Sequence, residues 1–272
     1  MRTIVHLSDL HFGRIDPAVL GPVVRHVNDL RPDLVAVSGD LTQRARTAEF
    51  EQAREFLASL PVPQIVIPGN HDVPLHNVYA RFAHQLTRYR RYIGDDLEPT
   101  YADDEIAVIG VNTARSLTFK GGRINAVQVS RIREWLCPFG PDVTKIIVTH
   151  HPFDLPPGHG GRVVGRARMV MEQLAACGAD IFLSGHLHLG HTGDTTLRYR
   201  IPNLSALIVQ AGTATSTRGR GESNSFNVLR IDGPEIAVDR LSWDPARAAF
   251  VLLAAERFRR DASGVLRPSP VR

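Results

Sequence analysis

The segment Gln64-Ile-Val-Ile-Pro-Gly-Asn-His-Asp72 joins an apolar run to a cluster of polar residues. The first four residues predict a short buried strand, and the Pro-Gly pair after them ends it before Asn70, His71 and Asp72. The same pattern recurs at four other places: Thr3–Leu7 before Ser8–His11, Leu34–Val37 before Ser38–Asp40, Lys145–Thr149 before His150–His151, and the strand Ile181–Ser184, which runs into Ser184–His188. Because an open α/β sheet binds its ligands outside the carboxyl ends of its strands, we expect all five clusters to face one crevice.

Strands and helices alternate over the first two thirds of the chain, and closely spaced strands follow from about Thr195. Crossovers of helical length imply parallel pairing in the first part, and short connections imply antiparallel pairing in the second. The fold class is therefore α/β with an α+β portion. The predicted helices are Pro17–Leu30, Thr47–Leu60, Asn77–Tyr92, Asn125–Cys137 and Arg168–Cys177, and the later strands are Leu197–Ile201, Leu207–Ala211, Phe226–Ile231, Ile236–Asp239 and Phe250–Phe258.

The length of 272 residues is enough for one domain with a core of its own. No internal repeat or Ser/Gly-rich linker divides the chain, so we expect a single domain over residues 1–258. The remaining residues, 259–272, are polar and contain two prolines. They are expected to form a disordered C-terminal tail.

The charge and the cysteines exclude several classes of protein. Thirty-two Lys and Arg residues against 28 Asp and Glu residues give a net charge of +4, which suits a small anionic substrate and falls short of a nucleic-acid-binding surface. The two cysteines, Cys137 and Cys177, lie far apart and predict neither a disulfide framework nor a cysteine zinc module. The first polar cluster begins by Asp9, which leaves no room for a signal peptide, and no apolar run approaches the ~20 residues that span a bilayer. We therefore expect a cytoplasmic protein without a membrane span.

The residue types in the five clusters favour a metal centre. Carboxylates, imidazoles and an amide oxygen suit Mn, Fe, Zn or Co rather than ions that prefer thiolates. Asp9 and His11 stand two residues apart after a strand, as do His186 and His188, so each pair can point to one side. Asp40 follows a glycine, where the backbone can approach an ion closely. The clusters offer more donors than one ion needs, which predicts two divalent ions about 3.5–4 Å apart.

Taken together and in this order, the motifs resemble those of the calcineurin-like metallophosphoesterase superfamily. The matching blocks are Asp9-x-His11, Gly39-Asp40, Gly69-Asn-His-Asp72, His150 and Gly185-His-x-His188. They span about two thirds of the chain, and their local sequences resemble the bacterial class III cyclic-nucleotide phosphodiesterases most closely. The resemblance implies a four-layer fold, in which two facing mixed β-sheets are flanked by α-helices. It also implies that a homodimer is possible.

The resemblance further implies a role for each matching residue. One metal ion would be held by Asp9, His11, Asp40 and His188, and the second by Asp40, Asn70, His150 and His186. His71 would stand beside the scissile phosphate without binding metal. A hydroxide that bridges the ions would attack phosphorus in line, and His71 would assist the leaving group.

Three functions stay open at this point. The favoured one is hydrolysis of a 3′,5′-cyclic nucleotide such as cAMP. The second is hydrolysis of another phosphodiester or pyrophosphate, such as a glycerophosphodiester or a nucleotide-linked lipid precursor; that lipid branch carries Arg at the position of His71. The third is a non-catalytic scaffold that binds proteins, which should have lost metal ligands, whereas none of the seven is missing.

Two long loops and three arginines complete the list of candidates. The segments 152–165 and 212–225 are rich in residues typical of loops, and loops of this length are often functional. Arg218 and Arg220 in the second loop, and Arg14 after the first motif, could bind a substrate phosphate, because a guanidinium matches phosphate oxygens. A solvated loop remains the alternative. His151 is expected to be a turn residue rather than a metal ligand.

Overall fold

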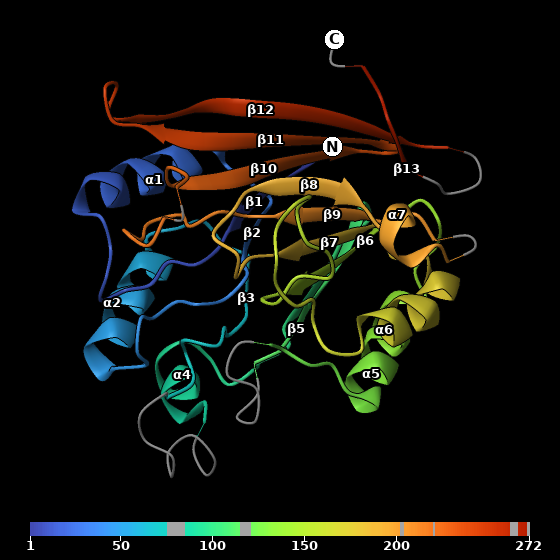
Figure 1. Ribbon diagram of the computed structural model, residues 1–272, viewed down its shortest axis with the longest axis horizontal. Coiled ribbons are helices and arrows are strands. Elements are labelled where there is room, and N and C mark those ends of the chain that lie inside the picture. The colour runs from blue at the N-terminus through green and yellow to red at the C-terminus, as the bar shows by residue number, and fades with distance from the viewer. Residues whose placement is uncertain (75–84, 115–120, 202–203, 220, 262–265, 271–272) are drawn as a thin grey trace.

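The first β-sheet of the structure, a computed structural model, mixes parallel and antiparallel strands (Figure 1). The structure describes residues 1–74, 85–114, 121–201, 204–219, 221–261 and 266–270. In this part of the chain, seven strands lie in the order β13-β12-β11-β10-β1-β2-β3, with β1 parallel to β2 and antiparallel to β10. Their bounds are β1 (Arg2–Leu7), β2 (Leu34–Val37), β3 (Gln64–Val66), β10 (Ser225–Asp232), β11 (Glu235–Asp244), β12 (Ala249–Arg260) and β13 (Leu266–Pro268).

The second sheet has a parallel centre with an antiparallel strand at each edge. Over the described ranges its six strands lie in the order β4-β5-β6-β7-β9-β8, and β5, β6, β7 and β9 run parallel. Their bounds are β4 (Thr100–Ala102), β5 (Ile106–Val111), β6 (Thr144–Thr149), β7 (Ile181–Ser184), β8 (His191–Asp194) and β9 (Leu207–Gln210).

The two sheets face each other across a core built from alternate residues of their strands. Ile146 and Val148 of β6 join Ile4 of β1 in the cluster between the sheets. Val5 and Ile147, each one residue further along a strand, belong instead to clusters beneath the helices. This period of two is what a sheet buried on both faces requires.

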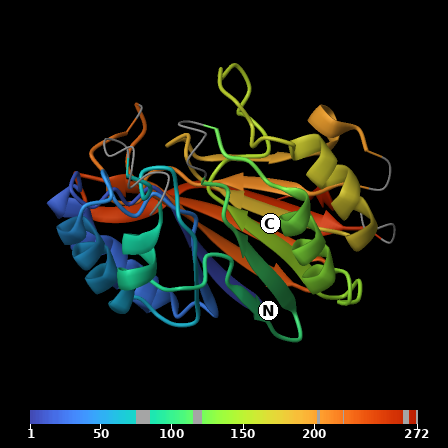
Figure 2. The ribbon, with the colours of Figure 1, turned by 90° about the horizontal axis from the view of Figure 1, so that it is seen from below.

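Helices cover the outer face of each sheet and complete the four layers (Figure 2). The expected arrangement of two facing mixed sheets flanked by helices is confirmed. Asp16 caps the first helix by accepting a hydrogen bond from Ala18 N, and Asn125 and Gln128 form a capping box at the start of α5. The helices are α1 (Pro17–Leu30), α2 (Thr47–Ala58) and α4 (Thr87–Tyr92) on the first sheet, and α5 (Ala126–Leu136), α6 (Ala167–Leu174) with the 3₁₀ turn η1 (Ala175–Cys177), and α7 (Thr196–Tyr199) on the second.

Two local predictions are wrong. The segment expected as strand 197–201 begins as the short helix α7, because Asp194 accepts a hydrogen bond of 2.7 Å from Thr196 N at its start and Tyr199 is buried. Disorder from residue 259 onward is also wrong for the described part of the tail. Arg260 ends β12, and Leu266 begins β13 and joins the core between the sheets. Most of the helix predicted over 77–92 lies outside the described residues.

Cys137 and Cys177 form a disulfide that their spacing in the sequence does not suggest. Cys137 follows the last residue of α5, and Cys177 ends η1. The packing of α5 against α6 brings the two Cα atoms to 4.6 Å, within the range that a disulfide bridges. A contact between two helices thus pairs two cysteines that lie 40 residues apart in the sequence.

None of the helices among the described residues is both long and apolar enough to cross a bilayer.

Candidate metal centre

The five polar clusters meet where the parallel strands of the two sheets end. The loops after β1, β2 and β3 of the first sheet lie against the loops after β6 and β7 of the second. Asp9, His11, Asp40, His150 and His188 are 0–3% exposed there. Charged and imidazole groups buried this deeply require partners, so their mutual geometry decides what the site can do.

A first group of donor atoms surrounds the carboxylate of Asp9. Its Oδ1 lies 3.2 Å from Nε2 of His188 and 3.6 Å from Nε2 of His11, and the two Nε2 atoms are 3.2 Å apart. Oδ2 of Asp40 is 3.7 Å from the same atom of His11. Donors bound to one ion at about 2.0–2.2 Å stand about 3.0–3.6 Å apart. The four residues could therefore hold one ion with small adjustments.

A second group surrounds Nε2 of His150. That atom lies 3.4 Å from Oδ2 of Asp40, 3.1 Å from Oδ1 of Asn70 and 3.3 Å from Nδ1 of His186. The same oxygen of Asp40 belongs to both groups, as a carboxylate that bridges two ions would. The seven residues that the sequence predicts as ligands are thus brought together in two sets of four.

The backbone at the site is held in an unusual conformation. Five of the seven residues have left-handed φ angles: Asp9 (52°), His11 (51°), Asp40 (53°), His186 (72°) and His188 (59°). This region costs a residue with a Cβ atom about 1–2 kcal/mol, and such strain clusters at functional sites. A side chain at Gly69 would collide with the carboxylate of Asp40, which explains the glycine there. The conformation serves to aim the side chains.

Backbone carbonyls orient three of the imidazoles. Nδ1 of His150 lies 2.8 Å from the carbonyl of Ser38, and Nδ1 of His188 lies 3.0 Å from that of Arg218. Nδ1 of His11 is 3.4 Å from the carbonyl of Thr42. A carbonyl only accepts, so each Nδ1 donates a proton to its carbonyl, and it is Nε2 of each ring that faces the carboxylates. This is the arrangement in which histidine binds metal.

The electrostatics of the site also fit cations. Burial alone would raise the pKa of Asp40, but the neighbouring imidazoles, His150 first, hold it below its ordinary value. Burial lowers the pKa of His150, but the charge of Asp40 and a hydrogen bond to it raise the pKa to about 9. Burial and the charge of His150 lower the pKa of His186 to about 4, which leaves it neutral. Oδ1 of Asp9 is buried and accepts no hydrogen bond among the described residues. Divalent cations would satisfy that oxygen and both carboxylates, so the residues fit such ions.

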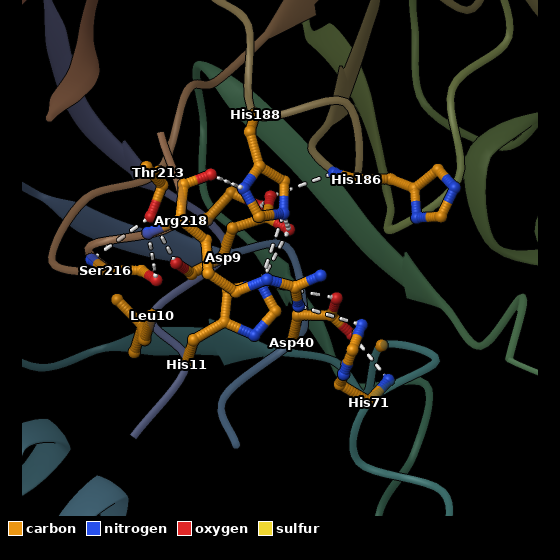
Figure 3. A network of polar contacts seen from close by, with 12 residues as sticks. Asp9, Leu10, His11, Asp40, His71, His186, His188, Thr213, Ser216 and Arg218 are labelled. Carbon is orange, nitrogen blue, oxygen red and sulfur yellow. Dashed lines mark hydrogen bonds and ion pairs between the residues drawn. The ribbon is translucent and has the colours of Figure 1, made fainter. Parts of the chain in front are cut away.

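His71 lies beside both groups without belonging to either. Its Nδ1 donates to the carbonyl of Gln43 at 2.8 Å, and its Nε2 accepts from Nη1 of Arg218 at 3.0 Å. Figure 3 shows Arg218 extending across His11 toward His71. The backbone N–H of His71 also donates to Oδ1 of Asp40 at 2.8 Å. The imidazole of His71 therefore lies beside the donor groups, and its Nε2 faces the guanidinium of Arg218.

The remaining candidates have different outcomes. Arg14 is exposed, and its backbone carbonyl accepts from Thr217 N at 3.0 Å, so it helps to fix the loop that carries Arg218. Arg220 lies outside the described residues. The carboxylate of Asp72 accepts hydrogen bonds from Gly69 N, at 2.8 Å, and from Thr42 N, at 2.8 Å, so it joins two loops of the site.

Sequence reasoning missed the threonines that attach the loop 212–225 to the site. Oγ1 of Thr213 donates to the carbonyl of Asp9, and Oγ1 of Thr215 to that of Leu10, each at 2.7 Å. The loop thereby brings the guanidinium of Arg218 to His71 and the backbone carbonyl of Arg218 to His188. Its richness in Ser and Thr was the available signal, since such hydroxyls bond to nearby backbone groups.

Comparisons with known proteins find phosphodiesterases among the relatives of this chain. The chain is 39% identical over 80 residues to a glycerophosphodiester phosphodiesterase of Enterobacter lignolyticus, a match that covers 25% of this chain and 29% of that protein. It is 25% identical over 257 residues to a cAMP/cGMP dual specificity phosphodiesterase of Mycobacterium tuberculosis, covering 84% of this chain and 75% of that one. The chain thus spans less than a third of the first of these relatives. Among solved structures, purple acid phosphatase PPD1 from yellow lupin seeds superposes with a TM-score of 0.72 at 14% identity, over 97% of this chain and 54% of that one, and so shares its fold.

The family model described as calcineurin-like phosphoesterase matches residues 2–190, which include all seven predicted metal ligands and His71. The expected family resemblance is confirmed: this chain belongs to the calcineurin-like phosphoesterase family.

Proposed function

We propose that the chain is a phosphodiesterase that works with two divalent metal ions. The observation that carries the proposal is the pair of donor groups that share Oδ2 of Asp40, each with donor atoms 3.1–3.7 Å apart. One ion would be held by Asp9, His11, Asp40 and His188, and the other by Asp40, Asn70, His150 and His186. When bound, such a pair supplies an activated water and neutralises charge on the phosphoryl oxygens.

Arg218 binds and orients the substrate in this proposal. Its guanidinium lies beside the donor groups, where Nη1 is 3.0 Å from Nε2 of His71. A phosphodiester offers non-bridging oxygens that a guanidinium prefers to a neutral imidazole, because the bond is then assisted by charge. Transfer of Arg218 from His71 to a phosphoryl oxygen would fix the substrate and release Nε2 of His71.

His71 handles the proton of the leaving group. Its Nδ1 is fixed on the carbonyl of Gln43, so only Nε2 is available to the substrate. After Arg218 moves to the phosphate, Nε2 can take up a proton from solvent and pass it to the oxygen that leaves phosphorus. A bond from phosphorus to the oxygen of water forms, the bond to the leaving oxygen breaks, and the products are an alcohol and a phosphomonoester, which for a cyclic nucleotide are parts of one molecule.

A 3′,5′-cyclic nucleotide such as cAMP is the favoured substrate. The names of relatives support a cyclic nucleotide, a glycerophosphodiester or a nucleotide-linked lipid precursor, and the presence of His71 favours the first two over the third. The presence of all seven predicted donor residues, close to one another, supports an enzyme over a non-catalytic scaffold. The native ions are among Mn, Fe, Zn and Co, which all suit this donor set.

Metal analysis and hydrolysis together test the proposal. We expect the purified chain to hold about two divalent ions, and a chelator to abolish hydrolysis of bis-p-nitrophenyl phosphate. A panel of cyclic nucleotides, dinucleotides and glycerophosphodiesters with Mn²⁺ then identifies the substrate. A chain that binds no metal and shows no hydrolysis would refute the proposal, and a strong preference for p-nitrophenyl phosphate would point to a monoesterase.

The other expectations from sequence stay predictions with tests of their own. Cell fractionation tests the cytoplasmic location, and sedimentation tests the homodimer. A filter-binding assay tests the expected lack of stable binding to nucleic acid.

A further inference from the structure

A third imidazole, His151, lies beside the second donor group. Its ring centroid is 4.7 Å from that of His186 and 4.9 Å from that of His150, and those two are 5.1 Å apart. The three rings form a nearly equilateral triangle. One ring nitrogen from each lies within 4.8 Å of the other two, so the three could approach one ion.

His151 is held in place by contacts that leave one of its nitrogens without a partner. Nδ1 lies 2.8 Å from Oγ1 of Thr113, which also accepts from the backbone N–H of His151 at 3.3 Å. The side chain is buried, and Nε2 has no hydrogen-bond partner in the part of the chain that the structure describes. A buried imidazole nitrogen in that state is unfavourable unless something binds it.

Gly122 shows that the position of this ring is constrained. A Cβ atom at Gly122 would stand 2.5 Å from Cγ of His151 and 2.9 Å from Cβ of Thr113. The ring is thus enclosed by Gly122 and Thr113 on one side and by His150 and His186 on the other. A residue that served only as a turn, as the sequence suggests, would need neither the enclosed ring nor the free nitrogen.

We propose that His151 is an additional donor to the second metal position through Nε2. With it, His150, His151 and His186 present three imidazoles to one ion, while Asp40 and Asn70 supply oxygens. The inference rests on the proposed two-metal site. Its chemical consequence is selectivity, because imidazole donors favour Co²⁺ and Zn²⁺ over Mn²⁺ and Mg²⁺.

Two substitutions at His151 separate a metal donor from a packing residue. His151→Asn keeps a polar atom near the position of Nδ1, where it can bond to Thr113, and lacks any donor at the position of Nε2. His151→Gln can bring an amide oxygen to that second position. The measurement is a calorimetric titration of the metal-free chain with Co²⁺, and separately with Mn²⁺, with metal content checked by mass spectrometry. The control is His26→Asn on α1, which makes the same chemical change in a half-buried histidine that packs on Phe226.

We expect His151→Asn to lower the affinity for the second Co²⁺ ion by about tenfold or more, because removal of groups that tune a metal site costs about 10–100-fold in affinity. The affinity for the second Mn²⁺ ion should fall by less. His151→Gln should fall between this variant and the wild type. A second variant leaves His151 itself intact. Gly122→Ala should displace the ring of His151 and also lower the affinity for the second Co²⁺ ion.

Wild-type affinity for the second ion in His151→Asn, or equal losses for Co²⁺ and Mn²⁺, would overturn the inference while leaving the two-metal phosphodiesterase intact. Failure of the wild-type chain to bind two ions would instead refute the proposed function. Far-ultraviolet circular dichroism of each variant shows whether it is folded before its titration is interpreted.

Discussion

Two clusters of buried charge lie at opposite ends of the parallel strands, and they differ in how far the protein itself satisfies them. At the amino ends of β6 and β7, the carboxylate of Asp180 accepts from Nη2 of Arg260 at 2.9 Å and from Lys145 N at 2.8 Å. Nζ of Lys145 donates to the carbonyl of Cys177 at 2.7 Å. The backbone of all three charged residues is regular. Every formal charge in this cluster has a partner from the chain.

At the carboxyl ends, by contrast, the backbone is left-handed at five positions and Oδ1 of Asp9 accepts no hydrogen bond among the described residues. Imidazole nitrogens of different residues also crowd together there, at 3.2 Å between His11 and His188 and at 3.3 Å between His150 and His186. The comparison teaches how to distinguish a structural ion cluster from a binding site. In the first, each charged group has an oppositely charged or polar partner from the chain, and the second is arranged around something that the chain does not supply.

The largest expected effect separates the two clusters by function. Asp40→Ala removes the oxygen shared by both donor groups, so we expect loss of both ions and a fall in diesterase activity on the order of 10⁴-fold or more. Mass spectrometry of bound metal and the bis-p-nitrophenyl phosphate assay measure it.

Asp180→Ala is the matched control, since it removes an equally buried carboxylate from the other cluster. It should lower the free energy of unfolding and leave the metal content unchanged. Two retained ions in Asp40→Ala would show that this residue does not bridge.

The next effect concerns proton transfer without metal loss. His71→Ala should retain both ions and lose about 10²–10⁴-fold in kcat, the usual contribution of a general acid. The rate is compared on two substrates, one with a p-nitrophenolate and one with an alkoxide as leaving group. The loss should be smaller for p-nitrophenolate, which needs less protonation. Loss of metal from this variant would mean that His71 is a ligand.

A smaller effect is expected for substrate binding. Arg218→Met removes a guanidinium while keeping most of the apolar stem, so KM should rise by about tenfold or more, the value of a charge-assisted hydrogen bond. Arg14→Met is the control, because Arg14 is exposed and contacts the loop through its backbone. An unchanged KM in Arg218→Met would remove this residue from the substrate site.

The smallest effect is a pH dependence of stability in the structural cluster. Burial, only partly offset by Arg260, raises the pKa of Asp180 to about 6 from its ordinary value of 3.8. The folded chain therefore binds more protons than the unfolded chain between about pH 4 and pH 6, so the contribution of Asp180 to stability decreases as the pH rises through this window.

Urea unfolding of the wild type and of Asp180→Asn at several pH values checks that dependence. The difference between their free energies of unfolding should change by about 2–3 kcal/mol across the window. A flat difference would mean that the carboxylate keeps its ordinary pKa in the folded chain.

Much of the site could be predicted from sequence because its residues follow strands that are easily recognised. Asp9, Asp40 and Asn70 come directly after short apolar runs, and parallel strands end at one edge of a sheet. The continuous apolar run Ile146–Val148 is likewise typical of a strand buried on both faces, and its residues do pack into clusters on either side of the sheet. The pattern of apolar residues within a strand, and the polar residues that follow each strand, are local features that can be read from a single sequence.

What could not be predicted depends on contacts between distant segments. The disulfide needs the packing of α5 against α6, and the strand at Leu266 needs the edge of β12. The role of Arg218 depends on threonines that bond to the backbone after β1. The proline after His151 predicts a turn residue, and the proposal that it is a metal donor depends on the ring positions of His150 and His186 and on the unpartnered Nε2, which the sequence does not contain.

The shared oxygen of Asp40 has a thermodynamic consequence for how the centre is loaded. If one atom serves two ions, the two binding equilibria are linked, and the factor by which the first ion changes the affinity for the second is the same whichever ion binds first. The coupling free energy must therefore be the same whichever of the two positions is filled first. Because Asp40 is the residue that both donor groups share, a substitution there should change this coupling free energy more than one at any other residue of the centre.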